Sequence, residues 1–468
     1  MDGFETLLSP LARRKILDGA FAVLEDHGVE CTHARARERL AEVPGVRVGP
    51  DRVRFAREAV AAHLERRRTE QPPDDVRFGM YGPWCSFSYC DPLTNQVRMP
   101  TESEAVDAAR LIDALTAGTG AFGGAVPVYL PGVDPRLQTF RQEICAVTYT
   151  RRLGGKLTAL DRGEIGYVKA LYKAAGRRYK LALQGLISPL RLNSEVMDTF
   201  FEEIADPDLD IEISCSIPMA GATAPVVFPA ALIQAVAETL AVDFVFNALA
   251  PTRRFDCLTV RLEPFDMKSA NIVFGSPEWC VLNRACVELE RDLRGTPRRY
   301  GIFRSNSRSM DAQAMIERSM SVLYQAMNGV RRFGAVGQLC VDEVFSPLQA
   351  VIDVQILKYV ERVVRGLDAS WDESVDTVAL LREGDADGTF LMHDTTAEHF
   401  RTFYGMDTLF TYENLNAWRD AGSKGLEDRA REELARLLAG TRFELDAARR
   451  EEVDRVASEG TRYLESLA

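Results

Sequence analysis

Strand-like and helix-like segments alternate between residues 76 and 369, and this alternation restricts the fold of the chain more than any other feature. Each strand-like run is short and apolar, and the stretch after it repeats its apolar residues at helical spacing. The runs lie at 119–130, 156–161, 179–187, 210–218, 255–265, 299–305 and 334–344. Strands that alternate with helices predict a parallel sheet. With an eighth strand drawn from 78–100, these units predict an α/β fold, the closed (β/α)8 TIM barrel.

Helix-start signals support this organisation. Thr101 and Glu104 predict a capping box, and other helices are expected to begin at a capping residue followed by proline. These starts are Asp134-Pro135, Ser276-Pro277 and Ser346-Pro347. The segments on either side of the alternating region have helical spacing. We therefore expect an N-terminal helical segment over 1–75, a β/α barrel over 76–369 and a C-terminal helical extension over 370–468.

The charge balance argues against nucleic acid as a partner. The chain has 57 basic and 69 acidic residues, a net charge of −12, whereas non-specific nucleic-acid binding needs a basic surface. The first residues lack a signal peptide's basic start and apolar run, and no stretch approaches the roughly 20 uncharged apolar residues of a membrane span. The nine cysteines contain no CxxC pair, which predicts reduced thiols and a cytoplasmic location.

Several predicted strands have one polar face. Side chains alternate along a strand, so Leu258, Val260 and Leu262 point to one side while Arg261 and Glu263 point to the other. The apolar side must face the helices, and the polar side must therefore face the barrel interior. Barrel enzymes place their working residues at the C-terminal strand ends. The polar residues at these ends are Asp161, Gln184, Ser216, Glu263, Arg304, Asp342 and Glu343.

Gln338, Asp342 and Glu343, all on the last predicted strand, are the candidate catalytic residues. Candidate substrate-binding residues at the strand ends are Gln184, Ser216, Glu263 and Arg304. An alternative interpretation remains open, in which Arg261 forms a structural ion pair with Glu212 or Glu263 inside the barrel.

The aromatic segment at 78–90 supplies the remaining candidates. A cage of such rings can bind a quaternary ammonium group through cation–π contacts, and a plain hydrophobic plug is the alternative. The rings that we consider are Phe78, Tyr81, Trp84, Phe87 and Tyr89.

Other chemistries lack support in the sequence. Catalytic zinc needs three protein ligands, and none of the five histidines lies in a predicted barrel strand, so we predict no metal site. The phosphate-binding motifs GxGxxG and GxxxxGK[ST] and the nucleophile motif GxSxG are absent. Lys156 and Lys180 begin their strands and therefore lie at the wrong end for Schiff-base chemistry, although Lys268 lies just beyond a strand.

Five segments resemble the trimethylamine methyltransferase family, specifically its members that lack pyrrolysine, some of which act on glycine betaine. They are SIPMAGATAPVVFPAALIQAVAETLA (216–241), SANIVFGSPE (269–278), SMDAQAMIERSMSVLYQAMNG (309–329), GQLCVDEVFSPLQAVID (337–353) and FLMHDTTAEHFR (390–401). The resemblance implies a (β/α)8 barrel that moves a methyl group from an amine to the cobalt of a corrinoid. That corrinoid (a cobalamin) is carried by a separate partner protein, so we expect no tightly bound cofactor.

The resemblance also bears on the substrate. Pyrrolysine-containing members carry that residue on the strand that resembles 334–344, which here reads GAVGQLCVDEV and has only standard residues. We therefore expect a quaternary amine such as glycine betaine rather than trimethylamine. Its carboxylate would need a donor, and the candidates are Arg304 and the amides near Gly221–Thr223.

Two alternatives remain open on this scaffold. One is a methyltransferase that uses a sulfonium or methoxy donor, and the other is a non-catalytic barrel that binds a betaine or a corrinoid. The expected partners are the small methylated amine and a cognate corrinoid protein, with neither nucleic acid nor membrane. We also expect a homo-oligomer.

Overall fold

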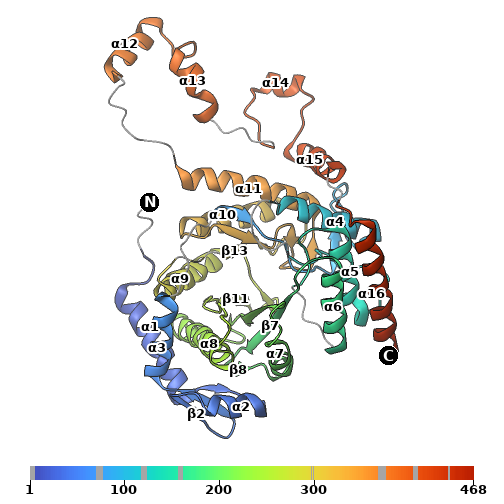
Figure 1. Cartoon of the computed structure of the whole chain (residues 1–468). Helices are drawn as coiled ribbons and strands as arrows, with labels where there is room; N and C mark the ends of the chain where they lie inside the picture. The colour runs from blue at the N-terminus through green and yellow to red at the C-terminus, as the bar shows by residue number, and fades with distance from the viewer. Residues whose placement is uncertain are drawn as a thin grey trace.

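The computed structural model describes residues 6–69, 77–117, 124–155, 162–296, 298, 300–366, 376–403, 409–440 and 443–467. The described elements form a mixed α/β structure in which helices surround a central set of short strands (Figure 1). The predicted run at 156–161, with the candidate Asp161, lies outside the described residues.

The N-terminal segment contains helices and a small sheet. Its elements are α1 (Pro10–Ala22), the π-helix η1 (Val23–His27), β1 (Val29–Glu30), α2 (Ala34–Ala41), β2 (Val46–Val48), β3 (Arg52–Phe55) and α3 (Arg57–Thr69). The prediction of helices alone over 1–75 is therefore wrong. Gly28 ends η1 with φ 72°, and a side chain there would collide with the Val53 carbonyl, so the chain turns sharply into β1.

The first half of the alternating region begins with short strands. It contains β4 (Gly79–Met80), β5 (Ser88–Cys90), β6 (Val97–Arg98), α4 (Glu102–Leu115), the 3-10 helix η2 (Pro135–Leu137), α5 (Gln138–Tyr149), α6 (Arg162–Ala174), β7 (Lys180–Ile187), β8 (Arg191–Leu192), the 3-10 helix η3 (Ser194–Val196), α7 (Met197–Glu203) and β9 (Asp210–Cys215). The capping box of Thr101 and Glu104 at the start of α4 is confirmed.

The second half of the region and the C-terminal segment follow. They contain β10 (Met219–Ala220), α8 (Phe228–Leu249), β11 (Glu263–Asp266), β12 (Asn271–Ile272), α9 (Pro277–Arg294), β13 (Tyr300–Ile302), α10 (Ala312–Met327), β14 (Arg332–Gly334), β15 (Gln338–Leu339), β16 (Val344–Phe345), α11 (Pro347–Arg365), α12 (Thr377–Asp387), α13 (Asp394–Phe403), α14 (Leu415–Asp420), α15 (Leu426–Gly440) and α16 (Ala447–Ser466). Ser276 and Ser346 cap α9 and α11 as predicted. The described part of the C-terminal segment contains the helices α12 to α16.

The strands form four small sheets. Their orders are β2-β3-β1-β8-β7-β9, β10-β11-β12, β13-β14-β4 and β15-β16-β5-β6. The pairs β7–β9, β10–β11, β13–β14 and β14–β4 are parallel, as the alternating pattern predicts. β4 lies beside β14 although the two strands come from opposite ends of the alternating region. The described residues do not form one continuous hydrogen-bonded barrel.

Three of the predicted strands are largely irregular in the described residues. Residues 124–130, the described part of the run 119–130, form only an isolated bridge at Val128. Within 255–265 only Glu263 onward pairs with a neighbouring strand, because side chains of α9 bind the preceding backbone. Val260 N donates to Glu290 Oε2 at 3.1 Å, and Leu258 O accepts from Arg294 Nε at 2.8 Å. The predicted strand over 334–344 is wrong in part. After Gly334 the chain forms only the two-residue β15 and the start of β16 within this range, because four residues between Gly334 and Val344 have positive φ.

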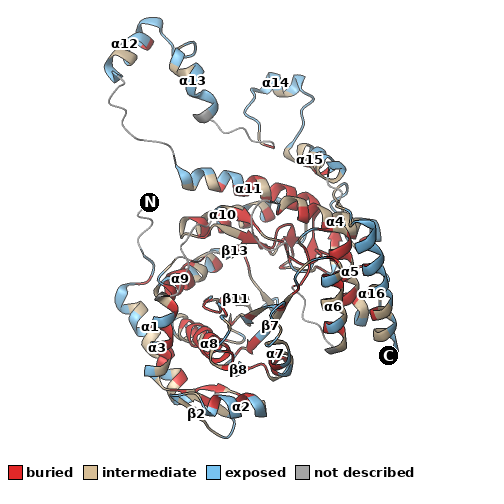
Figure 2. Cartoon of the chain, in the orientation of Figure 1, coloured by how far each residue is buried: buried red, intermediate tan, exposed pale blue. Residues whose placement is uncertain are grey.

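Two large apolar cores, and two small clusters, lie between the described elements. One packs α1 and α3 against α8 and also contains side chains of β7 and α9, while the other contains side chains of α4, α10, α11 and α15. Among the described helices, α8 is long and apolar enough to cross a membrane by length and composition. However, 78% of its most apolar window is buried within the structure (Figure 2). Core helices of soluble proteins have the same composition, so α8 is weak evidence for a membrane span.

A network around Arg98 joins the β5–β6 hairpin to the start of α4. Arg98 Nη2 lies 2.5 Å from Asp91 Oδ2 and 2.6 Å from Glu104 Oε1. The Arg98 hydrogen bonds lower the pKa of each carboxyl, Asp91 and Glu104, to about 2. Arg98 also lies 5.4 Å from the centre of the Tyr89 ring.

We expect Arg98→Met to lower the free energy of unfolding at pH 7, and we expect this loss to shrink under acid. Because folding lowers both carboxyl pKa values, the network stabilises the fold above the ordinary carboxyl pKa of about 4. Its contribution disappears as the pH falls toward 2. Urea unfolding of both proteins at pH 7, 5 and 3.5 measures the difference. A difference that stays constant with pH contradicts the assignment.

Candidate functional site

The structure brings several of the predicted site residues together at the ends of the central strands. Tyr81 follows β4, Glu263 begins β11, and Arg304 follows β13. Asp342 lies in the turn between β15 and β16, within the segment 335–343 that we call the loop after β14. Arg304 Nη2 lies 3.3 Å from Asp342 Oδ2. Glu263 and Arg261 lie close enough for their charges to shift the pKa of Arg304, which Glu263 raises and Arg261 lowers. We refer to Tyr81, Arg261, Glu263, Arg304 and Asp342 as the Arg304 cluster.

Arg304 is a buried cation with an unused hydrogen-bond donor. The residue is 8% exposed, and its guanidinium carbon lies 4.8 Å from the centre of the Phe274 ring. Its buried Nε has no hydrogen-bond partner among the described residues. Burial lowers the pKa of Arg304, while Asp342 raises it. A buried guanidinium with a spare donor is suited to binding an anion.

Glu263 is paired with Arg261. Glu263 is 3% exposed, and its Oε1 lies 3.2 Å from Arg261 Nη2. Burial raises the pKa of Glu263, while Arg261 and Arg304 lower it. The other oxygen, Oε2, accepts no hydrogen bond of ordinary geometry, although the nearby Trp279 indole N–H also lowers the pKa. Of the two partners considered for Arg261, Glu263 is therefore the one that it contacts, whereas Glu212 pairs with Lys180 at 2.5 Å.

Tyr81 is the predicted ring that joins this cluster. Its hydroxyl donates to the Gly301 carbonyl at 2.8 Å, and its ring packs edge-on against Tyr300 at 5.6 Å. Burial raises the pKa of Tyr81 to about 12, so the phenol stays protonated at neutral pH. A Cβ on Gly334 would lie 2.0 Å from the Tyr81 ring, so glycine at this point of β14 is what admits the ring.

The other candidate rings contact different parts of the molecule. Tyr89 is buried in β5 next to Arg98, and Phe78 stacks on Arg331. Phe87 is 54% exposed and packs edge-on against Tyr129 at 4.9 Å, while Trp84 is 38% exposed. Sequence reasoning missed Phe274, Trp279 and Tyr300, the aromatic side chains that do adjoin the cluster. They lie outside the aromatic-rich segment, and nothing local distinguishes them from core residues.

The three candidate catalytic residues have different environments. Gln338 is completely buried, and its amide bonds to the backbone N and O of Trp84 and to Ser86 Oγ at 3.2–3.3 Å. Gln338 therefore ties the loop after β14 to the segment after β4. Glu343 is exposed and accepts a hydrogen bond from the Cys340 thiol at 3.8 Å. Asp342 alone pairs with Arg304, and its side chain is 38% exposed.

Gln184 lies on β7, and Ser216 directly follows the neighbouring strand β9. Gln184 is exposed, and Ser216 Oγ accepts a hydrogen bond from Ser188 N at 2.6 Å. Ser188 Oγ in turn donates to Glu238 Oε2 at 2.5 Å, and Leu190 N donates to Glu238 Oε1 at 3.0 Å. Sequence reasoning missed this buried carboxylate. Its signal is an acidic residue in the apolar run of α8, which contains one other acidic residue, Asp243.

The loop after β14 has a strained backbone. Ala335, Gly337, Cys340 and Val341 have φ values between 48° and 75°. Left-handed φ is rare for a β-branched residue such as Val341 and costs about 1–3 kcal/mol, so the surroundings must impose it. Hydrogen bonds from Cys340 N to Ser307 O at 2.7 Å and from Val341 N to Ser305 O at 2.8 Å hold it. The strained segment leads directly to Asp342.

A buried ion pair forms hydrogen bonds with the backbone of the same loop. Arg318 of α10 and Asp353 of α11 are both completely buried and bond to each other through two donors and two oxygens. Arg318 also donates to the carbonyls of Ala335 and Gln338, and Asp353 Oδ2 accepts from Gly337 N at 2.7 Å. Both charges therefore bind the backbone of the loop that carries Asp342.

We expect Asp353→Asn to lower the free energy of unfolding by about 3–5 kcal/mol, because it leaves the Arg318 charge buried and uncompensated. The double change Arg318→Met with Asp353→Leu should cost much less, since no charge remains. Urea unfolding measures both. The control is Asp18→Asn, which breaks the pair with Arg57, where both side chains are 46% exposed, and should cost about 0–1 kcal/mol. Equal losses for Asp353→Asn and the control contradict the assignment.

The part of the chain that the structure describes has no group of three or more His, Cys, Asp or Glu residues that could hold a metal ion. Its chemistry-bearing groups at the strand ends are arginine, carboxylate and aromatic side chains. This set can bind a small molecule that has both an anionic and a cationic group.

Comparison with known proteins places these residues in a family. The profile described as trimethylamine methyltransferase (MTTB) matches residues 181–459, which include Gln184, Ser216, Glu263 and Arg304 but not the aromatic candidates between 81 and 89. The trimethylamine methyltransferase MttB of Methanosarcina barkeri (strain Fusaro / DSM 804) is 25% identical over 225 residues, which cover 48% of this chain and 44% of that protein.

Other relatives agree with this match. Trimethylamine methyltransferase MttB of Methanosarcina thermophila is 24% identical over 225 residues, with 48% of this chain and 45% of that protein covered. MttB2 of Methanosarcina mazei is 25% identical over the same length, with 48% and 44% covered. The chain thus matches less than half the length of these relatives. Because the family profile covers more than half of this chain, the protein belongs to the trimethylamine methyltransferase family.

Proposed function

We propose that the protein moves a methyl group from a small quaternary amine with a carboxylate, similar to glycine betaine, to the cobalt of a corrinoid on a partner protein. The observation that carries this proposal is Arg304, a buried guanidinium with an unused donor among carboxylates and aromatic rings. Membership of the family supports methyl transfer from a methylated amine. The residues 334–344 are all standard, which favours a quaternary amine over trimethylamine.

We propose that the central strands close into a (β/α)8 barrel. Parallel pairing of β7–β9, β10–β11 and β13–β14 supports closure. So does the parallel pairing of β14, late in the alternating region, with β4 at its start. The parallel bridge between Ser86 and Val128 and the bond from Gly154 N to Gly124 O at 2.8 Å support continuation on the other side. The segments 1–75, 76–369 and 370–468 would then be the N-terminal segment, the barrel and the extension.

In this proposal the substrate binds through both of its charges. Its carboxylate accepts hydrogen bonds from Arg304, and its ammonium group lies among Tyr81, Tyr300 and the carboxylates of Glu263 and Asp342. Aromatic faces attract a quaternary ammonium without a hydrogen bond. Holding both ends aims one methyl group outward and restricts the approach geometry. Gln338 and Glu343 would act by positioning the loop that carries Asp342.

The reaction needs no general acid. The carbon–nitrogen bond breaks with its electron pair on nitrogen, so a quaternary ammonium leaves as a neutral amine. A bound corrinoid supplies the cobalt(I) nucleophile that accepts the methyl group. Carboxylates near the cation must not over-stabilise the ground state, because only stronger binding of the transition state accelerates the step. The Arg261 pair with Glu263 reduces the negative charge that the cation meets.

The strand-end loops are suited to receiving a partner-borne corrinoid. Exposed apolar side chains follow several of the central strands, and such side chains are suited to contact with a large flat ring. They are Trp84, Phe87, Val226, Val227 and Met267, with exposures between 38% and 77%. Gln184 and Asp342 are also accessible there.

The first test is methyl transfer itself. Purified protein with cob(I)alamin, or with a corrinoid protein, and glycine betaine should consume the cobalt(I) species, followed by its absorbance. The comparison substrates are carnitine, proline betaine, trimethylamine, a dimethylsulfonium compound and a methoxy compound. Transfer only from the sulfonium or methoxy compound would replace the proposed donor. Calorimetric binding of a betaine without any turnover would indicate a non-catalytic binding protein.

The second test addresses Arg304. We expect Arg304→Met to raise KM for a betaine by at least about tenfold, because a hydrogen bond to a charged group contributes about 1.5–3 kcal/mol. Choline or tetramethylammonium, which lack the carboxylate, should be affected far less. Arg136→Met serves as the control, since Arg136 is an exposed arginine whose one ion pair within the described part of the chain is with Asp134. A loss that is the same for choline and betaine would refute the carboxylate role.

A further inference from the structure

The helices α12 and α13 form a separate hairpin, which we call the arm (residues 376–403). Local hydrogen bonds and side-chain contacts define the ends of its helices and the turn between them. Asp376 accepts hydrogen bonds from Val378 N and Ala379 N, and Gly388 ends α12 in the left-handed conformation. Phe390 packs on Gly384, where a Cβ would lie 2.0 Å from its ring, and His393 lies 3.3 Å from Glu383.

The arm buries almost nothing within its own chain. Gly384 is its only buried residue among those described, and the arm projects away from the rest of the molecule (Figures 1 and 2). Large apolar side chains on it are Val378, Leu381, Leu391, Met392 and Phe400, with exposures of 57%, 58%, 78%, 87% and 45%. Helices of ten or eleven residues are marginal in water without tertiary packing. The arm therefore requires a surface that covers its apolar side chains.

The charge of the arm restricts what that surface can be. The arm has six acidic residues and two arginines, a net charge of −4. A second arm would repel it, so the complementary surface must be basic and apolar.

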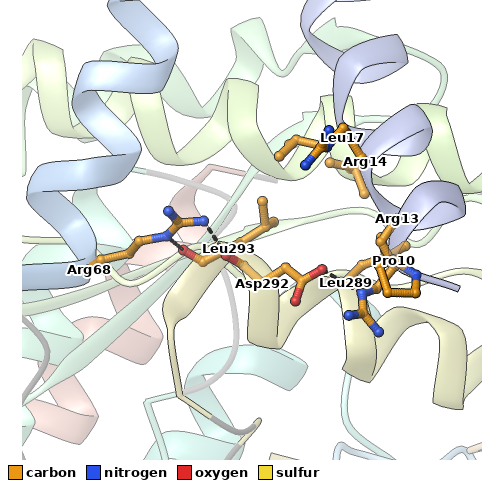
Figure 3. Close-up of a pocket in the computed structure, with 9 residues that line it drawn as sticks. Pro10, Arg13, Arg14, Leu17, Arg68, Leu289, Asp292 and Leu293 are labelled. Carbon is orange, nitrogen blue, oxygen red and sulfur yellow. Dashed lines mark hydrogen bonds and ion pairs between the residues drawn. The ribbon is translucent and has the colours of Figure 1, made fainter. Parts of the chain in front are cut away.

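One cavity on the N-terminal side of the molecule has this composition. It has a volume of about 510 Å³ and lies between α1, α3 and α9, with α8 at its floor. Leu17, Val236, Leu289 and Leu293 supply apolar side chains, and three arginines and one aspartate lie around them (Figure 3). We call this cavity the α1–α9 groove.

The arginines of the groove differ in the hydrogen bonds and ion pairs that they make. Arg13 lies 2.8 Å from Asp292, and Arg68 donates to the carbonyls at the end of α9. Arg14 is exposed and makes no hydrogen bond or ion pair within the described residues. Figure 3 places Arg14 beside Leu17 in the lining of the groove. The groove thus presents an unpaired cation beside an apolar floor.

We propose that the arm of one copy docks in the α1–α9 groove of a second copy, and that the exchange is reciprocal. Leu391, Met392 and their apolar neighbours would cover the floor, while acidic residues of the arm would pair with Arg14. Reciprocal exchange gives two identical contacts, which suits a symmetric dimer. This proposal does not rest on the proposed function, because neither element belongs to the Arg304 cluster.

The experiment is light scattering coupled to size-exclusion chromatography of the full chain from 1 to 100 µM. We expect a dimer for the natural sequence and a monomer for both L391E/M392E and R14E. The controls are L93E, at an apolar residue that is 76% exposed elsewhere, and R136E, and both should remain dimers. Thermal melts should show that the rest of the fold is retained in every variant.

Mixing the two variants gives a sharper test. A chain with the changed arm and a chain with R14E together still have one intact arm and one intact groove, so they should form a heterodimer that neither forms alone. A monomer at every concentration overturns the proposal, as does a dimer that both variants leave intact. If only the arm variant dissociates, the groove is the wrong receiving surface. A monomeric chain whose arm becomes protected from proteolysis only with a corrinoid protein overturns the second copy as occupant.

Discussion

The buried ion pair between Arg318 and Asp353 supports the segment on which the candidate site depends. The pair joins α10 to α11, and its remaining donors and oxygens bind the backbone of the loop after β14. That loop adopts left-handed φ at four residues, one of them Val341, which an isolated chain would avoid. The pair offsets this strain together with the hydrogen bonds from Cys340 N and Val341 N to the carbonyls of Ser307 and Ser305. Without these bonds, Asp342, which lies in the loop, would lose its defined distance from Arg304.

Buried charged side chains also bind backbone groups elsewhere along the central strands. Glu290 of α9 accepts from Val260 N and binds Arg294 and Arg298, which donate to the carbonyls of residues 258 and 260. Asp243 of α8 binds His63, Arg67 and the backbone N of Cys257. Charged side chains of the outer helices thus satisfy backbone groups that neighbouring strands leave unpaired. Buried charge of this kind stabilises only when every partner is present.

The Arg304 cluster contains ion pairs of this kind and also a hydrogen-bond donor that no described residue uses. Arg261 and Glu263 neutralise each other, whereas Arg304 keeps a buried donor that no described residue accepts from. Its position over Phe274 stabilises the guanidinium without consuming its hydrogen-bonding groups. The arrangement accounts for how a buried cation can persist beside a site for a zwitterion. It also explains why aromatic side chains far apart in sequence, Tyr81, Phe274 and Trp279, adjoin one cluster.

The sequence by itself determined the alternation of strands and helices, the parallel pairing, the capped helix starts and the polar residues at the strand ends. These depend on local spacing and on chemistry that neighbouring residues share, and Arg304, Glu263 and Asp342 were found in this way. Only the tertiary structure decided which rings approach Arg304, which groups pair, and where strand geometry gives way to a loop. Val341 and Gln338 illustrate the reason. Their conformation and contacts are imposed by residues from other elements, such as Arg318, Ser305 and Trp84, and no local pattern in the chain records which of these will meet.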